Sequence, residues 1–141
     1  MKTICRSAEE TMELGASLGR SLPANSVVCF FGELGAGKTT FIKGLAAGVA
    51  LVSADAINSP TFTYLNIYTG KRTVYHFDLY RLRDADEFMG MGFDEYFEAG
   101  GICCIEWSER ILPLLPPNVV NVRMAHVSPT EREIIIELGI E

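Results

Sequence analysis

A short glycine-rich motif carries the residues of this chain best suited to chemistry. Residues 32–39, GELGAGKT, match the pattern G-x-x-x-x-G-K-[ST] at every fixed position. Glycines allow the backbone of such a loop to approach a phosphate group closely, and the loop N–H groups surround its negative charge. Lys38 would place a positive charge on the β- and γ-phosphates of a nucleotide, and the Thr39 hydroxyl would ligate Mg²⁺. The motif therefore predicts a site for a nucleoside triphosphate and Mg²⁺.

The segments on either side of the motif must position it. Residues 27–31 are apolar without interruption, which predicts a strand buried on both faces of a parallel sheet. Residues 40–49 are good helix formers with an apolar face that contains Phe41, Leu45 and Val49. A strand before the motif and a helix after it form the context in which this pattern binds phosphate. The alternative, a glycine-rich turn that fits the pattern by chance, is disfavoured by this context.

Two acidic residues follow predicted strands further along the chain. Residues 102–105 are a second wholly apolar run that ends at Glu106, where a Mg²⁺ ligand is expected beside a phosphate-binding loop. Asp78 comes just after a strand predicted at 73–77, and α/β proteins collect site residues at such strand ends. The alternatives are a solvent-facing carboxylate at Glu106 and a turn or helix cap at Asp78. His76 is interpreted as a packed or half-exposed strand residue.

Several hydroxyl groups gather in the segment 59–64, SPTFTY. Pro60 favours an extended backbone at Ser59, which suits a loop that enters a strand. Switch loops of nucleotide-binding proteins use such hydroxyls to sense the γ-phosphate or Mg²⁺. We therefore predict a switch-like role for Thr61, with an ordinary loop as the alternative.

The rest of the chain predicts alternating strands and helices. Ser7 and Glu10 form a capping box that starts a helix ending near Leu22. Two hairpins are predicted, at 63–68 with 73–77 and at 119–127 with 133–138. Short helical segments are predicted at 84–89, 93–97 and 108–112, the last ended by Pro113. The expected fold is α/β and P-loop NTPase-like, with three layers: a mixed, mostly parallel sheet flanked by helices, with antiparallel hairpins.

Length and composition indicate a single domain that spans residues 1–141. The chain has 12 basic and 18 acidic residues, a net charge of −6, which argues against autonomous binding to nucleic acid. None of the four cysteines belongs to a C-x-x-C pair, so buried free thiols in a reducing compartment are expected. The N-terminus lacks a signal-peptide pattern, and no apolar run approaches the roughly 20 residues that span a membrane. We therefore expect a cytoplasmic protein with no membrane or DNA partner.

Five segments of the chain resemble one protein family, TsaE, which is also called YjeE. They follow the order and spacing of that family and cover nearly the whole chain: GELGAGKTT (32–40), SPTFTY (59–64), HFDLYRL (76–82), EFMGMGFDEYF (87–97) and IEWSER (105–110). The glycine-rich motif alone is shared with many families, whereas HFDLYRL and IEW are far more specific. The resemblance implies a small bacterial P-loop ATPase. Its partners would be the TsaD–TsaB pair, which makes the threonylcarbamoyl modification on the tRNA adenosine next to the anticodon.

The resemblance also implies roles for individual residues. Thr39 and Glu106 look like the Mg²⁺ ligands, and Thr61 lies in the switch-like segment. Asp78 looks like a functional acid near the γ-phosphate, where it would orient the attacking water while Lys38 and Mg²⁺ neutralise the developing charge.

The nucleotide contacts implied by the resemblance begin at the glycine-rich motif. The phosphate cradle would consist of Gly35, Ala36, Gly37, Lys38, Thr39 and Thr40, and Glu33 would belong to the nucleotide-binding residues beside it. At Glu33 the family more often has Asp, and only the backbone at this position needs to matter. The adenosine end of ATP would lie near Glu9 and Thr130.

Other functions compatible with the motif are a small-molecule P-loop kinase, a GTPase switch and a nucleotide-dependent interaction module. The sequence shows no Arg-rich lid of the kind that kinases close over phosphates, no N-K-x-D and no D-x-x-G after the switch-like segment. An interaction module would differ from an ATPase only in turnover. Arg81 and Arg83 are the nearest candidates for an arginine finger, and neither is assigned. Slow hydrolysis alone and faster hydrolysis with TsaD–TsaB are therefore expected, with tRNA contacted only within that assembly.

Overall fold

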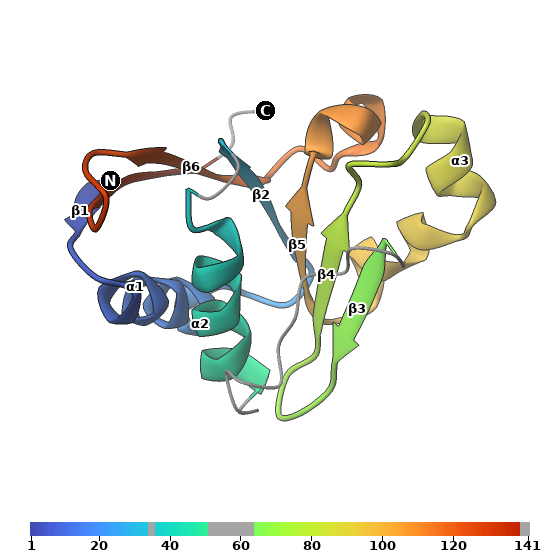
Figure 1. Cartoon of the computed structure of the whole chain (residues 1–141). Coiled ribbons are helices and arrows are strands. Elements are labelled where there is room, and N and C mark those ends of the chain that lie inside the picture. Colours follow the sequence, from blue (N-terminus) through green and yellow to red (C-terminus); the bar gives the residue numbers. More distant parts are fainter. Residues whose placement is uncertain (34–35, 51–63, 139–141) are drawn as a thin grey trace.

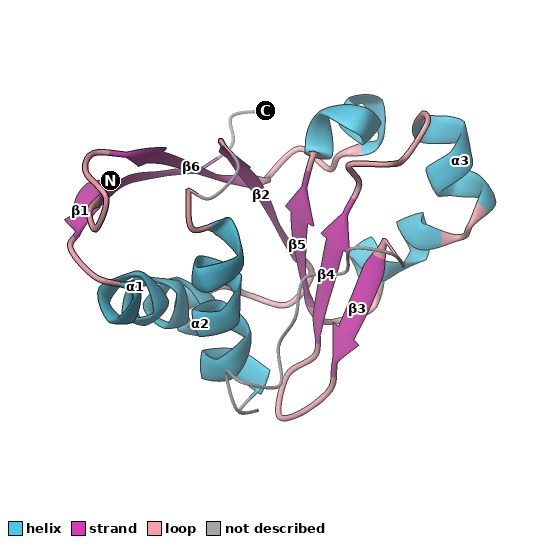
Figure 2. Ribbon diagram, viewed as in Figure 1, coloured by secondary structure: helices cyan, strands magenta, loops and turns pink. Residues whose placement is uncertain are grey.

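The computed structural model describes residues 1–33, 36–50 and 64–138 and shows one mixed sheet with helices on both faces (Figure 1). Gly35 and Thr61 of the predicted site lie outside these residues. The strands are β1 (Lys2–Cys5), β2 (Ser26–Gly32), β3 (Leu65–Tyr68), β4 (Val74–Asp78), β5 (Ile102–Glu106), β6 (Val120–His126) and β7 (Arg132–Leu138). The helices are α1 (Ala8–Ser21), α2 (Lys38–Ala50) and α3 (Ala85–Gly90), with 3₁₀ helices η2 (Phe93–Glu98) and η3 (Ser108–Leu114) (Figure 2).

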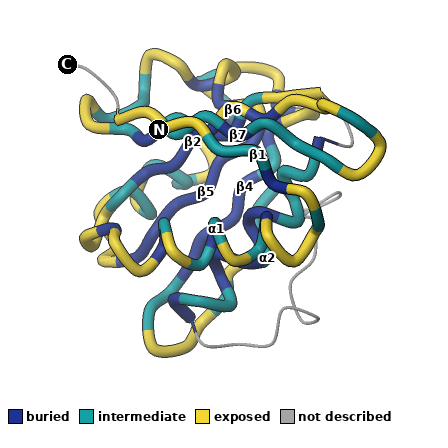
Figure 3. Tube along the Cα trace, turned by 90° about the vertical axis from the view of Figure 1, so that its left-hand side faces the viewer, coloured by how far each residue is buried: buried dark blue, intermediate teal, exposed yellow. Residues whose placement is uncertain are grey.

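The sheet has seven strands in the order β1-β7-β6-β2-β5-β4-β3. The four central strands β6, β2, β5 and β4 run parallel, whereas β1, β7 and β3 pair antiparallel with their neighbours at the two edges. Figure 3 shows β2, β4 and β5 buried along most of their length, as their uninterrupted apolar runs require. The predicted α/β fold, with a mixed sheet and antiparallel hairpins, is confirmed.

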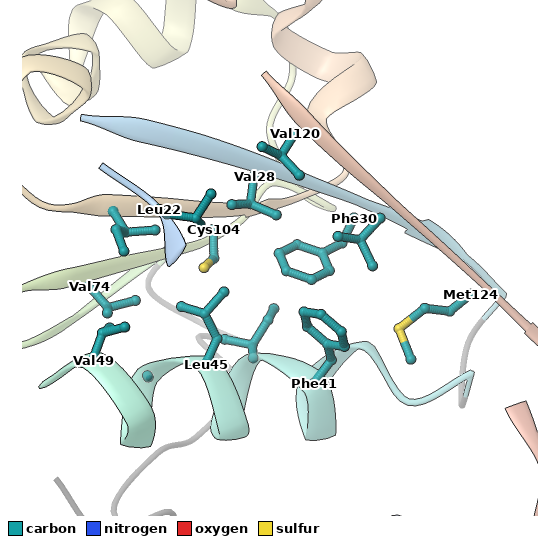
Figure 4. Close-up of a cluster of buried hydrophobic side chains, with 14 of the residues drawn as sticks. Leu22, Val28, Phe30, Phe41, Leu45, Val49, Val74, Cys104, Val120 and Met124 are labelled. Carbon is teal, nitrogen blue, oxygen red and sulfur yellow. The ribbon is translucent and has the colours of Figure 1, made fainter. Parts of the chain in front are cut away.

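Helices α1 and α2 form a layer on one face of the sheet, and α2 lies directly against the strands. Phe41 of α2 packs edge-on against Phe30 of β2, with ring centres 5.5 Å apart, and Leu45 lies beside them (Figure 4). The predicted capping box starts α1. The Glu10 N–H donates to the Ser7 hydroxyl oxygen at 3.1 Å, and the Arg6 N–H donates to the Glu10 carboxylate at 2.9 Å.

Glycines allow the backbones of α1 and α2 to touch. A Cβ added to Gly15 would lie 2.3 Å from the Phe41 carbonyl oxygen, and one added to Gly44 would lie 2.1 Å from the Met12 carbonyl oxygen. Neither position has room for a side chain. Helix α1 therefore packs closely along α2, the helix that begins at the motif lysine.

The opposite face of the sheet is covered by α3, η2 and η3. An aromatic cluster joins α3 and η2 to β4: Phe88 lies 5.6 Å from Phe77, 5.5 Å from Phe93 and 5.7 Å from Phe97, measured between ring centres. Helix α3 is capped at its N-terminus by Asp84, whose side chain accepts a hydrogen bond from the Glu87 N–H at 2.9 Å. The molecule therefore has the three layers that the sequence predicts.

The structure corrects the prediction that Pro113 ends the helix after Glu106. η3 is a 3₁₀ helix that continues to Leu114 with Pro113 inside it, and the backbone leaves helical values at Ile111, where φ is −128°. The break at Ile111 starts a new turn, and proline suits the start of a turn because its missing N–H would have no partner there. Ser108 lies within the helix, and Trp107 occupies the cap position.

The four cysteines are free and buried, as the sequence predicts: Cys5, Cys29, Cys103 and Cys104. Burial raises the pKa of Cys29 to about 11 and that of Cys103 to about 12, so both thiols stay protonated near neutral pH. In the described part of the chain, every helix is too short or too polar to cross a membrane.

Candidate functional site

The carboxyl ends of three parallel strands lie together on the side of the sheet that carries the glycine-rich motif. β2 ends at Gly32, β4 at Asp78 and β5 at Glu106. The register places Glu106 between Asp78 on one side and Phe30 on the other. In α/β sheets, ligands bind outside the carboxyl ends of the strands. The fold therefore brings the two predicted acids to the end of the strand that leads into the motif.

The backbone of the motif explains its glycines. Gly32 and Gly37 have φ values of +150° and +99°, which residues with a side chain rarely adopt. A Cβ at Gly32 would also lie 2.4 Å from the Met124 carbonyl oxygen of β6. Ala36 is fully buried, and its N–H donates to the Glu33 carbonyl oxygen at 3.0 Å, while the Glu33 side chain is exposed. Glu33 thus contributes to the loop through its backbone.

The Lys38 side chain turns back over the motif. Its Nζ donates a hydrogen bond to the Gly32 carbonyl oxygen at 2.8 Å and lies 5.8 Å from the centre of the Trp107 ring. Because Trp107 directly follows β5, the lysine lies near the ends of both β2 and β5. Thr39 and Thr40 follow it in the first turn of α2 and are half-buried. The positive charge is therefore held at the strand ends by neutral partners.

Glu106 is a buried carboxylate whose hydrogen-bond partner His76 is also buried. Glu106 is only 6% exposed and His76 is 0% exposed. The Oε2 atom of Glu106 lies 2.8 Å from Nε2 of His76. Burying a carboxylate is costly unless a hydrogen bond or an opposite charge compensates, and His76 supplies the hydrogen bond. The sequence interpretation of His76 as a packed or half-exposed strand residue missed this contact. The available signal was the spacing: His76 and Asp78 are two residues apart, so they share one face of β4.

Asp78 is half-buried at the end of β4. Its Oδ1 accepts a hydrogen bond from the Tyr80 N–H at 3.1 Å, which orients the carboxyl group. Burial raises the pKa of Asp78. The Tyr80 N–H opposes this rise, Glu106 adds to it, and His76 and Lys38 oppose it. These effects place Asp78 within the electrostatic reach of both Glu106 and Lys38.

Trp107 is partly exposed, and its ring lies near Lys38. Its ring centre lies 5.1 Å from that of Tyr80 and 5.8 Å from the Arg110 guanidinium, and Arg110 also donates to the Tyr80 carbonyl oxygen at 3.1 Å. Trp107 has a left-handed backbone, with φ +62° and ψ 40°. This conformation is uncommon for an aromatic residue, and such backbone outliers cluster at functional sites. Neither Trp107 nor Tyr80 is predicted from the sequence to have an individual role.

The two arginines considered as finger candidates follow β4. The Arg83 side chain is 79% exposed and pairs with Asp84 at 3.7 Å. The Arg81 carbonyl oxygen accepts a hydrogen bond from the Tyr64 hydroxyl at 3.2 Å.

A pocket of about 300 Å³ lies beside the first turn of α2. It is lined by Arg6, Ser7, Ala8, Thr11, Gly37, Thr40, Pro129, Thr130 and Arg132. The fold thus joins Thr130 to two residues of the motif region, Gly37 and Thr40. Glu9 is exposed in the first turn of α1 and is not among the lining residues. The volume is at the lower end of the range found for small-molecule sites, which begins at roughly 300 Å³.

A residue at the end of β5 and one in the first turn of α2 suit Mg²⁺ by their chemistry. Within residues 1–33, 36–50 and 64–138, no three His, Cys, Asp or Glu side chains gather into a metal-binding group. Mg²⁺ does not require such a cage, because it is held by one or two protein oxygens together with phosphate oxygens and water. The Thr39 hydroxyl and the buried Glu106 carboxylate are oxygen donors of this kind.

The fold and the site together define a class. The chain is an α/β protein with the architecture typical of P-loop nucleotide-binding proteins: a G-x-x-x-x-G-K-T sequence between a central parallel strand and a helix, with carboxylates at neighbouring strand ends. The model of the family "Threonylcarbamoyl adenosine biosynthesis protein TsaE" matches residues 5–134, and the chain belongs to this family. The resemblance seen in the sequence is therefore confirmed.

Individual relatives agree with the family model. A tRNA threonylcarbamoyladenosine biosynthesis protein TsaE from Treponema pallidum (strain Nichols) is 41% identical over 136 residues, which cover 96% of this chain and 99% of the relative. The protein of the same name from Bacillus subtilis (strain 168) is 38% identical over 127 residues, 89% of this chain and 78% of the relative. A crystal structure of Bacillus subtilis YdiB matches with a TM-score of 0.79 and 31% identity, covering 100% of this chain and 86% of that one.

Proposed function

We propose that this protein is a Mg²⁺-dependent ATPase that supports formation of threonylcarbamoyladenosine in tRNA, acting in the cytoplasm with a TsaD–TsaB-type complex. The observation that carries the proposal is the meeting of Lys38, Asp78 and Glu106 at the ends of three parallel strands in a member of the TsaE family. The family description and the names of the relatives supply the modification.

The phosphates would bind against the motif and the N-terminus of α2. Lys38 is held there by the Gly32 carbonyl oxygen and the Trp107 ring, two neutral partners that a phosphate would replace with a stronger charge-assisted contact. The nucleoside would extend into the adjoining pocket, where Thr130 lies near Gly37 and Thr40. Glu9 borders this pocket through its neighbour Ala8 and would contact the adenosine only at the rim.

The Thr39 hydroxyl and the Glu106 carboxylate would hold Mg²⁺ beside the phosphates. When bound, Mg²⁺ supplies charge neutralisation at the β- and γ-phosphate oxygens. Glu106 suits this role because it is nearly buried and held on one oxygen by His76. A carboxylate fixed in this way does not need to be reoriented when the site fills.

Asp78 would orient the water that attacks the γ-phosphate. The Tyr80 N–H fixes one of its oxygens, and burial raises its pKa, which makes it a better proton acceptor than an exposed carboxylate. Asp78 lies beside Glu106 in the register, on the side away from Phe30. The water would therefore be held next to the cation rather than over the apolar centre of the sheet.

The partner complex would complete the site. The sequence assigns no arginine finger, and an arginine supplied in trans raises the rate of phosphoryl transfer by roughly 10³–10⁵ in known systems. We therefore expect slow hydrolysis by the protein alone and faster hydrolysis with TsaD–TsaB. The net charge of −6 favours contact with tRNA only through that assembly.

The test is steady-state ATP hydrolysis with Mg²⁺, measured for this protein alone and with added TsaD–TsaB complex. Lys38→Ala is the inactive variant, and Lys43→Ala, on the same helix, is the matched control. Stimulation that is lost in Lys38→Ala and kept in Lys43→Ala would support the proposal. Nucleotide binding without turnover in either condition would contradict it in favour of an interaction module, and transfer of phosphate to a metabolite would favour a kinase.

A further inference from the structure

The geometry points to His76 as a positioning residue that holds the Glu106 carboxylate in place for the cation. This inference rests on the proposed function, because it takes Glu106 as the Mg²⁺ ligand. Its basis is the buried hydrogen bond between His76 Nε2 and Glu106 Oε2, 2.8 Å long. Among the described residues, no other hydrogen bond reaches the Glu106 carboxylate.

The register of the sheet produces this contact. β4 and β5 run parallel, His76 pairs with Cys104, and Asp78 pairs with Glu106. All four side chains face α2, because residues alternate along a strand and Cys104 belongs to the core beneath that helix. His76 is therefore one step back from Glu106 on the neighbouring strand, on the face where the motif lies.

The chemistry of the two groups assigns the direction of the bond. A carboxylate that ligates a cation is ionised and only accepts hydrogen bonds, so in the proposed site His76 Nε2 would donate the proton of this bond. One Glu106 oxygen is then occupied, and the other is available to the cation. Carboxylates that ligate metals are themselves hydrogen-bonded by neighbouring groups, which fix their orientation. His76 would do this from a position that solvent does not reach.

Packing alone does not explain a histidine at this position. The His76 ring is fully buried, and within the described part of the chain its Nδ1 has no hydrogen-bond partner. An unsatisfied polar atom in the core costs stability, so an apolar side chain would fill this space more favourably. The contact with Glu106 is what a histidine provides here and an apolar residue does not.

The first experiment measures how strongly Mg²⁺ tightens ATPγS binding, by calorimetry with and without Mg²⁺. His76→Leu removes the donor and keeps an apolar side chain of moderate size, whereas His76→Gln keeps an N–H donor near the position of Nε2. We expect His76→Leu to reduce the Mg²⁺-dependent tightening about 10–100-fold, with Mg²⁺-free binding unchanged, because loss of such partners typically weakens metal sites by that factor. His76→Gln should recover most of the loss.

Two controls separate positioning from general damage. Phe77→Leu alters a buried residue on the opposite face of β4 and should leave the Mg²⁺ effect unchanged. In a Glu106→Gln background, His76→Leu should cause no further loss, because the two residues act through one contact. Additive losses, or an equal loss in Phe77→Leu, would overturn the inference.

A measurement on the unaltered protein keeps the inference testable if His76→Leu fails to fold. ¹⁵N NMR of the imidazole nitrogens reports which one is protonated, and His126→Gln assigns the signals because the chain has only two histidines. The proton is expected on Nε2 of His76. A ring protonated on Nδ1 alone would overturn the inference. If Mg²⁺ does not tighten nucleotide binding in the unaltered protein, the proposed function fails, and that result differs from a failure confined to His76.

Discussion

Strands β4 and β5 carry different chemistry on their two faces. Toward α2, the alternating residues become polar at the carboxyl end of the strands: His76, Asp78 and Glu106. Toward α3 and η2, the same strands are apolar over their length: Tyr75, Phe77, Cys103 and Ile105. A single pair of strands thus serves as a packing surface on one side and as the base of the candidate site on the other. We expect substitutions on the face toward α3 and η2 to change stability, and substitutions on the face toward α2 to change chemistry.

The largest expected effect is on turnover. Asp78→Asn removes the carboxylate proposed to orient water and should lower kcat about 10²–10⁴-fold, the usual range for loss of a group that handles the proton. ATP binding should remain, because Lys38 and the motif are intact. Steady-state hydrolysis and calorimetry measure the two quantities, with Asp86→Asn on the other face as control. Full turnover in Asp78→Asn would remove Asp78 from the mechanism.

The opposite face should respond in stability. Phe88→Ala empties the centre of the aromatic cluster around Phe77, Phe93 and Phe97 and should lower the free energy of unfolding by about 3–5 kcal/mol. Chemical denaturation measures this loss, and Phe88→Leu should retain much of the stability. Nucleotide affinity of the folded protein should not change. A large fall in affinity would show that the two faces are coupled.

The contact between α1 and α2 gives an intermediate effect on the face that bears the site. Gly44→Ala forces a methyl group against the Met12 backbone, since its Cβ would lie 2.1 Å from the carbonyl oxygen. We expect a loss of about 1–3 kcal/mol in unfolding free energy, the usual cost of overpacking. Gly90→Ala is the control, because its Cβ would meet nothing within 4 Å. Equal stability of both variants would show that the helices separate without cost.

The smallest effect concerns pH. Burial raises the pKa of Asp78 in the folded protein, so the stability associated with its protonated form is complete below its ordinary pKa of 3.8 and is lost as pH rises through the folded value. Without nucleotide, Asp78→Asn should therefore match the wild type in acid and become the more stable protein toward neutral pH. Denaturation midpoints over this range test the sign. A wild type more stable than Asp78→Asn at neutral pH would contradict it.

Much of the fold follows from local patterns. The apolar runs at 27–31 and 102–105 predicted β2 and β5, and the capping box at Ser7 predicted the start of α1. The prediction that Pro113 ends the helix at 108–112 was wrong, because the break at Ile111 that accommodates Pro113 depends on packing rather than on composition. Of the candidate site, the roles of individual residues stay predictions, and Gly35 and Thr61 lie outside the described residues.

The sequence by itself determined the chemistry available to this protein: a glycine-rich loop with a lysine and a threonine, two acids after apolar strands, and membership in one family. These features are short in range, so residue type and spacing express them. Only the tertiary structure decided which groups meet. The bond from His76 to Glu106 spans 30 positions and depends on the parallel register of β4 and β5. The pocket that joins Ser7, Gly37 and Thr130 depends on the order of seven strands. Strand order and register are set by burial of both sheet faces at once, a condition that no single segment of the sequence expresses.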